Sequence, residues 1–100
     1  MLRYLSIGQL VKPLAGRDKN RWMVVVEVID EDYVLLADGK MRKVEKPKKK
    51  KIKHLSKSNT IFEDILQQII QGNLTNHAIR KKIAVQNGED KDKGDEKSDI

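Results

Sequence analysis

The chain has 100 residues, no cysteine and a formal net charge of +6 at pH 7. A chain of this length forms one domain with a small core, and the absence of cysteine excludes disulfides and thiolate metal sites. No stretch approaches the roughly 20 apolar residues of a membrane span, so we expect a soluble, cytoplasmic protein.

The positive charge is concentrated in one segment. Residues 40 to 57 hold ten Lys or Arg residues and one Glu. Such a cationic segment is typical of proteins that bind a polyanion, with nucleic acid as the first candidate. A lysine-guarded edge strand is the alternative, because lysines discourage edge-to-edge pairing, but that role needs far fewer charges.

The first predicted strand covers residues 9 to 13. Val11 should face the core, and Pro13 should lie at an edge or leave the sheet because proline has no amide hydrogen to donate. A polar turn follows, in which Gly16 and Asn20 are the residue types that tolerate a positive φ.

The second predicted strand runs from residue 22 to residue 29, where β-branched residues dominate. The alternation predicts that Val24, Val26 and Val28 share one face, with Glu27 on the other. Because Glu27 should point to solvent, we expect the three valines to face the barrel interior.

Three further short strands are predicted, at residues 33 to 37, 41 to 44 and 52 to 55. Asp38-Gly39 is a strong two-residue hairpin signal between the first two of them. Val34 and Leu36 should face inward, and residues 48 to 51 should form a loop or lead into the last strand. Five short strands predict a mainly β fold, a small SH3-like barrel over residues 6 to 57. An OB-type barrel, the alternative, would need more residues and a helix between strands.

The pattern of residues 58 to 86 predicts a short helical hairpin. Thr60 and Glu63 have the spacing of a capping box, Gly72 should end the first helix, and Thr75 should cap the second. The first helix carries one apolar stripe, formed by Ile61, Phe62, Ile65, Leu66, Ile69 and Ile70. Two interpretations follow: the hairpin packs on itself or on the barrel, or the stripe is a partner or dimer surface over residues 60 to 71.

The second helix has a narrower apolar seam, formed by Ile79 and Ile83, and its residues 80 to 82 should point outward. Residues 87 to 100 hold three lysines against six acidic residues and no large apolar residue except Ile100. We therefore expect a disordered acidic tail over residues 87 to 100.

No catalytic or cofactor motif is present in the sequence. His54 and His77 are the only histidines, and they lie in different predicted elements without the spacing of metal ligands. A phosphate-binding loop of the Walker type, a nucleophile elbow and paired carboxylates in an apolar setting are also missing. We therefore expect a protein that is not an enzyme and needs no metal or cofactor.

Several segments, taken together and in order, resemble the KOW domain. They are Ile7-Gly8-Gln9-Leu10-Val11, Ala15-Gly16-Arg17-Asp18, Val24 to Asp30, Tyr33-Val34-Leu35, Asp38-Gly39 and Ile52-Lys53-His54-Leu55. The pattern is most similar to the version in the large-subunit ribosomal protein family L-fourteen-e and in short bacterial proteins like it. The resemblance implies an SH3-like barrel of KOW type that binds ribosomal RNA through its first loop and basic edge.

Carried over by position, Gly16 matches the loop glycine of the KOW pattern, with Arg17 and Lys19 beside it. Asn20 stands where the family pattern often has a second glycine. The candidate RNA-binding residues are Gly16, Arg17, Lys19, Arg21, Lys40, Arg42, Lys43, Lys48, Lys49, Lys50, Lys51 and Lys53. A surface dominated by lysine favours recognition of RNA shape and backbone over base sequence. Trp22 either stacks on a base or packs at the barrel edge.

Two alternatives to an RNA-binding protein remain at this point. The chain is either a protein-interaction adaptor, with the candidate partner-binding residues Ile61, Phe62, Ile65, Leu66 and Ile69, or a transcription-elongation accessory. KOW domains also occur in elongation factors, but the tandem arrangement with a preceding α/β domain is missing here.

Overall fold

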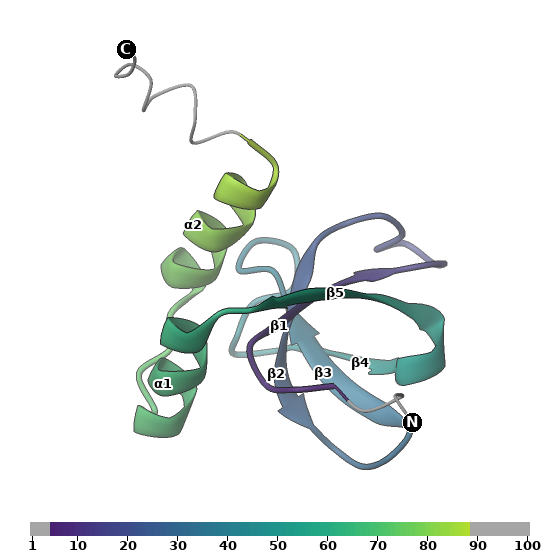
Figure 1. The fold of residues 1–100 in the computed structure, drawn as a ribbon, viewed down its shortest axis with the longest axis horizontal. Helices are drawn as coiled ribbons and strands as arrows, with labels where there is room; N and C mark the ends of the chain where they lie inside the picture. The colour runs from purple at the N-terminus through teal and green to yellow at the C-terminus, as the bar shows by residue number, and fades with distance from the viewer. Residues whose placement is uncertain (1–4, 89–100) are drawn as a thin grey trace.

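The computed structural model describes residues 5 to 88. Its elements are β1 (Gln9–Pro13), β2 (Met23–Val28), β3 (Tyr33–Ala37), β4 (Lys48–Lys51), a 3-10 turn (Ile52–His54), β5 (Leu55–Ile61), α1 (Glu63–Gln71) and α2 (Asn76–Gln86). The strands form one antiparallel sheet in the order β4-β3-β2-β1-β5. This sheet curls into a small SH3-like barrel, and both helices lie on one side of it (Figure 1). The predicted fold class, a small β-barrel followed by a short helical hairpin, is confirmed.

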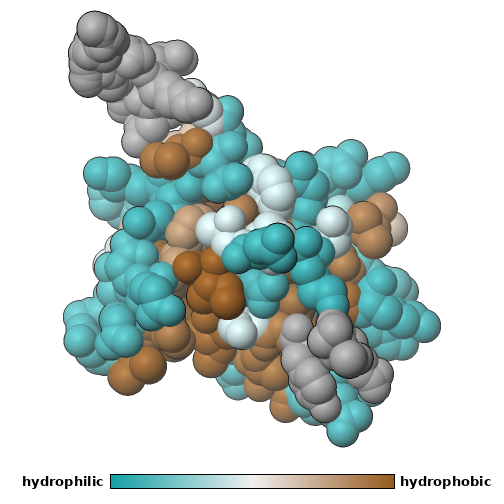
Figure 2. Space-filling model, in the orientation of Figure 1, coloured by the Kyte–Doolittle hydropathy of each residue, from teal (hydrophilic) through white to brown (hydrophobic). Residues whose placement is uncertain are grey.

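The apolar side chains form two cores on opposite faces of the sheet. The first core fills the barrel and consists of Leu5, Val11, Met23, Val25, Val34, Leu36, Ile52 and Leu55. The second lies between the outer face of the sheet and the helices, and its buried members are Leu10, Val24, Ala37, Ile65 and Ile79. The inward positions predicted for Val11, Val34 and Leu36 are therefore correct. Hydrophilic side chains cover much of the face shown in Figure 2, around an apolar area near its middle.

The predicted orientation of β2 is wrong. Val25 packs inside the barrel, whereas Val24 packs in the second core and Val28 is 39% exposed. Both faces of this strand are covered, the inner one by the barrel core and the outer one by the helices, so both carry apolar residues. The alternation pattern alone therefore does not indicate which face points into the barrel. A register shift between Val25 and Glu27 then interrupts the alternation, and Glu27 lies exposed beyond it.

The strand predicted at residues 41 to 44 is absent, so the two-residue hairpin predicted at Asp38-Gly39 does not form, although Gly39 does have a positive φ. The Asp38 Oδ1 atom accepts hydrogen bonds from the backbone amides of Lys40 and Arg42, at 2.9 and 2.8 Å. A side chain that captures nearby amides competes with a strand ladder, and here it stabilises a loop instead. The fourth strand is β4, in a segment that we expected to form a loop or a strand lead-in.

The last strand also differs from the prediction, because residues 52 to 54 form a 3-10 turn and β5 runs from Leu55 to Ile61. Thr60 therefore lies in β5. The first helix begins at Glu63, and its N-cap residue, Phe62, makes no side-chain cap hydrogen bond, so the predicted capping box is wrong.

Two helix signals are confirmed. Gly72 ends α1 with a φ of 75°, and the Thr75 hydroxyl caps α2 by accepting a hydrogen bond from the Ala78 amide at 3.1 Å. The expected tail over residues 87 to 100 lies outside the described residues except for its first two. Within residues 5 to 88, no helix is long and apolar enough to cross a membrane.

Candidate nucleic-acid interface

The first loop, residues 14 to 22, projects from the barrel between β1 and β2. Gly16 and Asn20 both have a positive φ, at 87° and 65°. Asn20 thus keeps the left-handed backbone that a glycine would adopt, at some conformational cost. Arg17 and Lys19 are exposed on this loop. The loop also meets the edge strand, because the Lys50 Nζ atom lies 3.4 Å from the place that a Cβ on Gly16 would occupy.

An ion pair joins the first loop to the loop between β3 and β4. The Arg42 Nη2 atom lies 3.1 Å from Asp18 Oδ2, and Arg42 Nε donates a hydrogen bond to the same oxygen at 3.2 Å. Asp18 is only 2% exposed. A buried carboxylate needs such a partner, so Arg42 holds the two loops together and its charge is largely compensated.

The four lysines of β4 divide into two pairs that face opposite sides of the strand. Lys48 and Lys50 pair in register with Leu36 and Val34, whose side chains point into the barrel. Lys49 and Lys51 pair with Leu35 and Tyr33 and face outward. Residues directly opposite each other in a sheet share a face, so β4 presents cations on both sides and not along a single rim.

The outward pair has its own partner. The Nζ atoms of Lys49 and Lys51 lie 4.6 and 5.7 Å from the centre of the Tyr33 ring, within the range of a cation–π contact. Lys51 and Lys53 also line a hollow with Glu31 and Asp32 from the turn between β2 and β3. The positive potential on this side is therefore partly offset.

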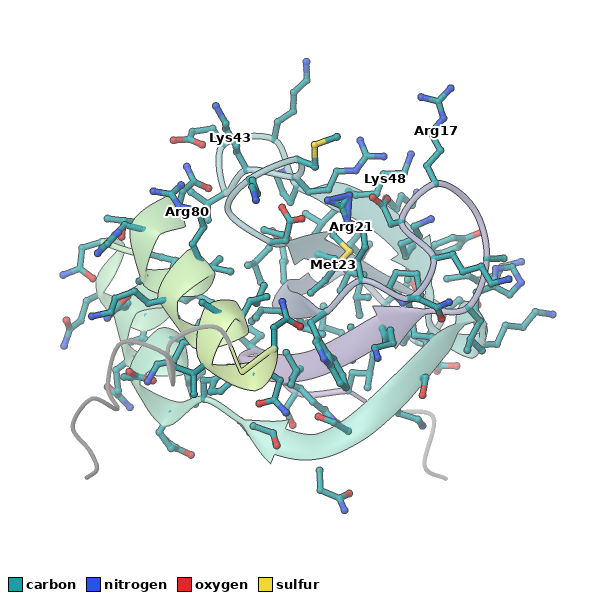
Figure 3. The ribbon with its side chains drawn as sticks, turned by 90° about the horizontal axis from the view of Figure 1, so that it is seen from above. Arg17, Arg21, Met23, Lys43, Lys48 and Arg80 are labelled. Carbon is teal, nitrogen blue, oxygen red and sulfur yellow. The ribbon has the colours of Figure 1, made fainter. Side chains whose placement is uncertain are left out.

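The inward side opens on a hollow of about 350 Å³ with four cationic residues in its wall. These are Arg42, Lys43, Lys46 and Lys48, and Met41 and Pro47 supply apolar wall. We call this site the cationic hollow. Figure 3 shows Arg17, Arg21 and Lys48 on one side of the barrel, with Lys43 farther along the same side. Except for Arg42, none of these cations forms an ion pair within residues 5 to 88.

No family model matches the chain. The large ribosomal subunit protein eL14 of Pyrobaculum arsenaticum is 34% identical over 63 residues, which cover 63% of this chain and 61% of that protein. The eL14 of Staphylothermus marinus is 28% identical over 79 residues, 71% of this chain and 82% of the relative. The eL14 of Desulfurococcus amylolyticus is also 28% identical, over 83 residues that cover 75% and 86%.

The chain resembles the eL14 family. Its matched part spans about three fifths of the length of the Pyrobaculum relative. These relatives are named as ribosomal proteins and not as enzymes, in agreement with the expectation that this eL14-like chain is not an enzyme. The part of the chain that the structure describes holds no cluster of His, Cys, Asp or Glu side chains that could bind a metal ion.

Sequence reasoning missed two cations of the eL14-like chain. Lys46 belongs to the basic segment but was not among the candidate residues, and it lines the cationic hollow. Arg80 was expected only to point outward from α2. Its Nη1 atom instead donates a hydrogen bond to the Gly39 carbonyl oxygen at 2.7 Å, which brings α2 to the loop after β3.

Asn76, the first residue of α2, makes a second link to that loop. Its Oδ1 accepts a hydrogen bond from the Val44 amide at 2.8 Å, and its Nδ2 donates to the Glu45 carboxylate at 2.9 and 3.2 Å. The bond from Asn76 lowers the pKa of Glu45 below its ordinary value. The single acid of the cationic segment is thus held toward α2.

Most of the apolar stripe of α1 packs against other residues of the eL14-like chain. Ile65 is buried in the second core, and Phe62 and Ile69 pack against it. Leu66 is half-buried beside Gly8, while Ile61 is 41% exposed. Most of the stripe thus packs on the sheet, as in the interpretation of a hairpin packed on the barrel, whereas Ile70 is 67% exposed.

Proposed function

We propose that this protein is a non-enzymatic RNA-binding protein that associates with the ribosome and contacts ribosomal RNA. The observation that carries the proposal is the cationic hollow, together with the exposed cations of the first loop and of β4. The names of the eL14 relatives support ribosome association and favour it over a role in transcription elongation.

The chemistry of this surface fits a phosphate backbone. Lys43, Lys46 and Lys48 are flexible point charges around a concave site, and Arg17 and Lys19 extend the positive surface along the first loop. Lysine ammonium groups contact phosphate oxygens without fixing a planar geometry, so they position an RNA without reading its bases. We infer that the protein recognises the shape and backbone of a folded RNA.

Salt dependence tests this proposal. A protein that neutralises about four to six phosphates loses affinity by orders of magnitude between low and moderately high salt. The triple variant Lys43→Gln, Lys46→Gln, Lys48→Gln should bind a structured RNA more weakly and with a flatter salt slope than the unaltered protein. An unchanged slope and affinity would remove the cationic hollow from the site.

The control is the double variant Lys81→Gln, Lys82→Gln on α2, which removes two charges outside the cationic hollow and the first loop. It should change the slope less than the triple variant. Sedimentation of the protein through a sucrose gradient, with and without ribonuclease, tests the ribosomal assignment. Cosedimentation with large-subunit particles that ribonuclease abolishes is the expected result, and sedimentation only as free protein at low salt would contradict it.

A protein partner on the first helix is the second candidate. Ile65 is buried and Ile61 lies at the end of β5, so the exposed apolar residue of the predicted stripe that lies on α1 is Ile70, at 67% exposure. The variant Ile70→Glu should leave the fold intact and abolish only such an interaction. Lost complex formation with RNA binding intact would favour this candidate over RNA recognition.

A further inference from the structure

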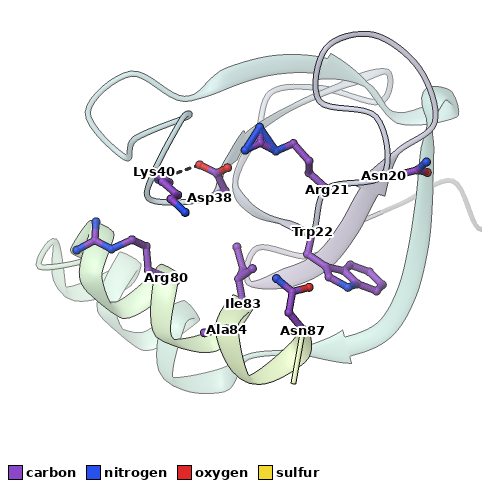
Figure 4. Close-up of a pocket in the computed structure, with 9 residues that line it drawn as sticks. All are labelled: Asn20, Arg21, Trp22, Asp38, Lys40, Arg80, Ile83, Ala84 and Asn87. Atoms are coloured by element: carbon purple, nitrogen blue, oxygen red, sulfur yellow. Dashed lines mark hydrogen bonds between the residues drawn. The ribbon is translucent and has the colours of Figure 1, made fainter. Parts of the chain in front are cut away.

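A second pocket, of about 350 Å³, lies between the barrel and α2 (Figure 4). Three cationic residues from three separate segments line it: Arg21 from the first loop, Lys40 from the loop after β3, and Arg80 from α2. Sequence reasoning grouped the first two with the cationic surface but did not connect either of them to α2. The pocket exists only because α2 packs beside the barrel.

The charge in this pocket is positive. Its one acid is Asp38, which is 7% exposed and whose Oδ1 is occupied by two backbone amides. Neither Arg21 nor Lys40 has an ion-pair partner in the described part of the chain. Arg80 donates to the neutral carbonyl of Gly39, which leaves its charge uncompensated. The pocket is therefore suited to an anionic group.

The other wall of the pocket is apolar and partly aromatic. Ile83 and Ala84 of α2 and Trp22 of the first loop line this part of the pocket, and Trp22 and Ile83 both pack against the second core. Figure 4 shows Asn87 between Ile83 and the Trp22 ring, and Asn20 farther out. The Lys12 Nζ atom lies 4.1 Å from the centre of the Trp22 ring and helps to fix that side chain. A flat aromatic surface beside cations suits a ligand that combines a planar ring with a phosphate, and amides can bond to the edge of such a ring.

We propose that this pocket binds one unpaired nucleotide of the RNA, with its phosphate against Arg21, Lys40 and Arg80 and its base against the wall formed by Trp22, Ile83 and Ala84. The inference rests on the proposed function and refines it. A paired base is held in its duplex, so an unstacked nucleotide is the part of an RNA that can enter this partly open pocket. An acidic peptide would satisfy the cations but would leave the aromatic wall without a matching group, so the nucleotide is the better fit.

Trp22 is the only tryptophan of the chain, and it reports directly on this pocket. A short single-stranded RNA should quench its fluorescence in a saturable titration. A blunt RNA duplex should bind with a smaller change, because it has no unpaired nucleotide to insert. Saturable quenching by a glutamate-rich peptide, at the affinity found for the single-stranded RNA, would overturn the nucleotide assignment.

Two variants test the pocket itself. Ala84→Phe fills it without changing charge, and it should weaken binding of the single-stranded RNA by roughly tenfold, as expected for the loss of one stacked base. The double variant Arg21→Gln, Lys40→Gln removes the anion contacts while keeping the side-chain stems, and it should weaken the same binding. The matched control is the double variant Lys81→Gln, Lys82→Gln, which removes two charges from α2 outside this pocket. It should change the affinity least.

The outcomes separate this inference from the proposed function. If Ala84→Phe and the double variant bind the single-stranded RNA as tightly as the control while duplex binding persists, the nucleotide pocket is refuted and the RNA-binding function stands. If the unaltered protein binds neither RNA, the proposed function fails with it. Circular dichroism checks that each variant is folded. If Ala84→Phe is unfolded, the RNA affinity of the double variant tests the pocket by itself.

Discussion

The two faces of β4 give the sharpest prediction, because two variants with equal charge loss should behave differently. One variant carries Lys48→Gln and Lys50→Gln, on the face of β4 that points toward the barrel interior and the first loop. We call it the mouth-side variant. The other carries Lys49→Gln and Lys51→Gln, on the outward side where both lysines lie over Tyr33. Glutamine keeps most of the aliphatic stem, so each pair loses charge with little change in packing.

The magnitudes follow from the contacts. Each phosphate contact that is lost should flatten the dependence of log affinity on log salt by about 0.7 to 0.9, so the mouth-side variant should lose roughly 1.4 to 1.8 in slope. The outward variant should lose clearly less. It should instead unfold more easily, by about 1 kcal/mol in total for two exposed cation–π contacts, which lowers the melting temperature by roughly 4 to 8 °C.

Fluorescence anisotropy with a labelled structured RNA, repeated over a series of salt concentrations, measures the slopes. Thermal unfolding followed by circular dichroism measures the stability. Equal slope losses in the two variants would refute the reasoning, because the cations would then act as a diffuse charge with no preferred face. A larger loss in the outward variant would place the RNA on the Tyr33 side.

Three further predictions concern stability. Asp18→Ala should lower the free energy of unfolding by about 1 to 3 kcal/mol in a denaturant titration, because Arg42 loses its buried partner, and Asp18→Asn should cost less. Gly39→Ala should destabilise by a similar amount, since its φ is 79° and a Cβ would overlap the first carbonyl oxygen of α2; an unchanged melting temperature would contradict this contact. Lys82→Ala should raise the pKa of Asp64 in an NMR titration. The Lys82 Nζ atom lies 2.7 Å from Asp64 Oδ2 and holds that pKa below its ordinary value of 3.8. Because the folded pKa is the lower one, the stabilisation is fully present above the ordinary pKa and is lost as the pH falls through the folded value.

The sequence predicted the order of elements better than their faces. Gly72 and Thr75 act on the helix ends next to them, so they could be placed without knowing the fold. The hairpin predicted at Asp38 and the capping box predicted at Thr60 could not, because longer-range strand pairing decided both segments. The orientation of β2 depends on what covers its outer face, and that cover comes from residues 63 to 86. A single-strand pattern cannot show this, and Glu27 misled the prediction because it lies beyond the irregularity in the strand.

The lysine strand was missed for a related reason. Lysine has a low preference for strands, and β4 forms because β3 offers it an unpaired edge, which is a tertiary cause. Composition alone located most of the candidate site, since the basic segment and the first loop stand out by charge. The ion pair of Arg42 with Asp18 joins residues 24 positions apart. The part played by Arg80 depends on helix packing, so neither contact has a local signature.

The second core has a practical consequence for anyone who wishes to study the barrel by itself. A fragment that stopped after β5 would expose Leu10, Val24 and Ala37 to water, and it would also free the loop that Asn76 and Arg80 now hold. Such a fragment should self-associate or lose cooperative unfolding. The helices are thus part of the smallest unit that can fold with its cationic surface in order.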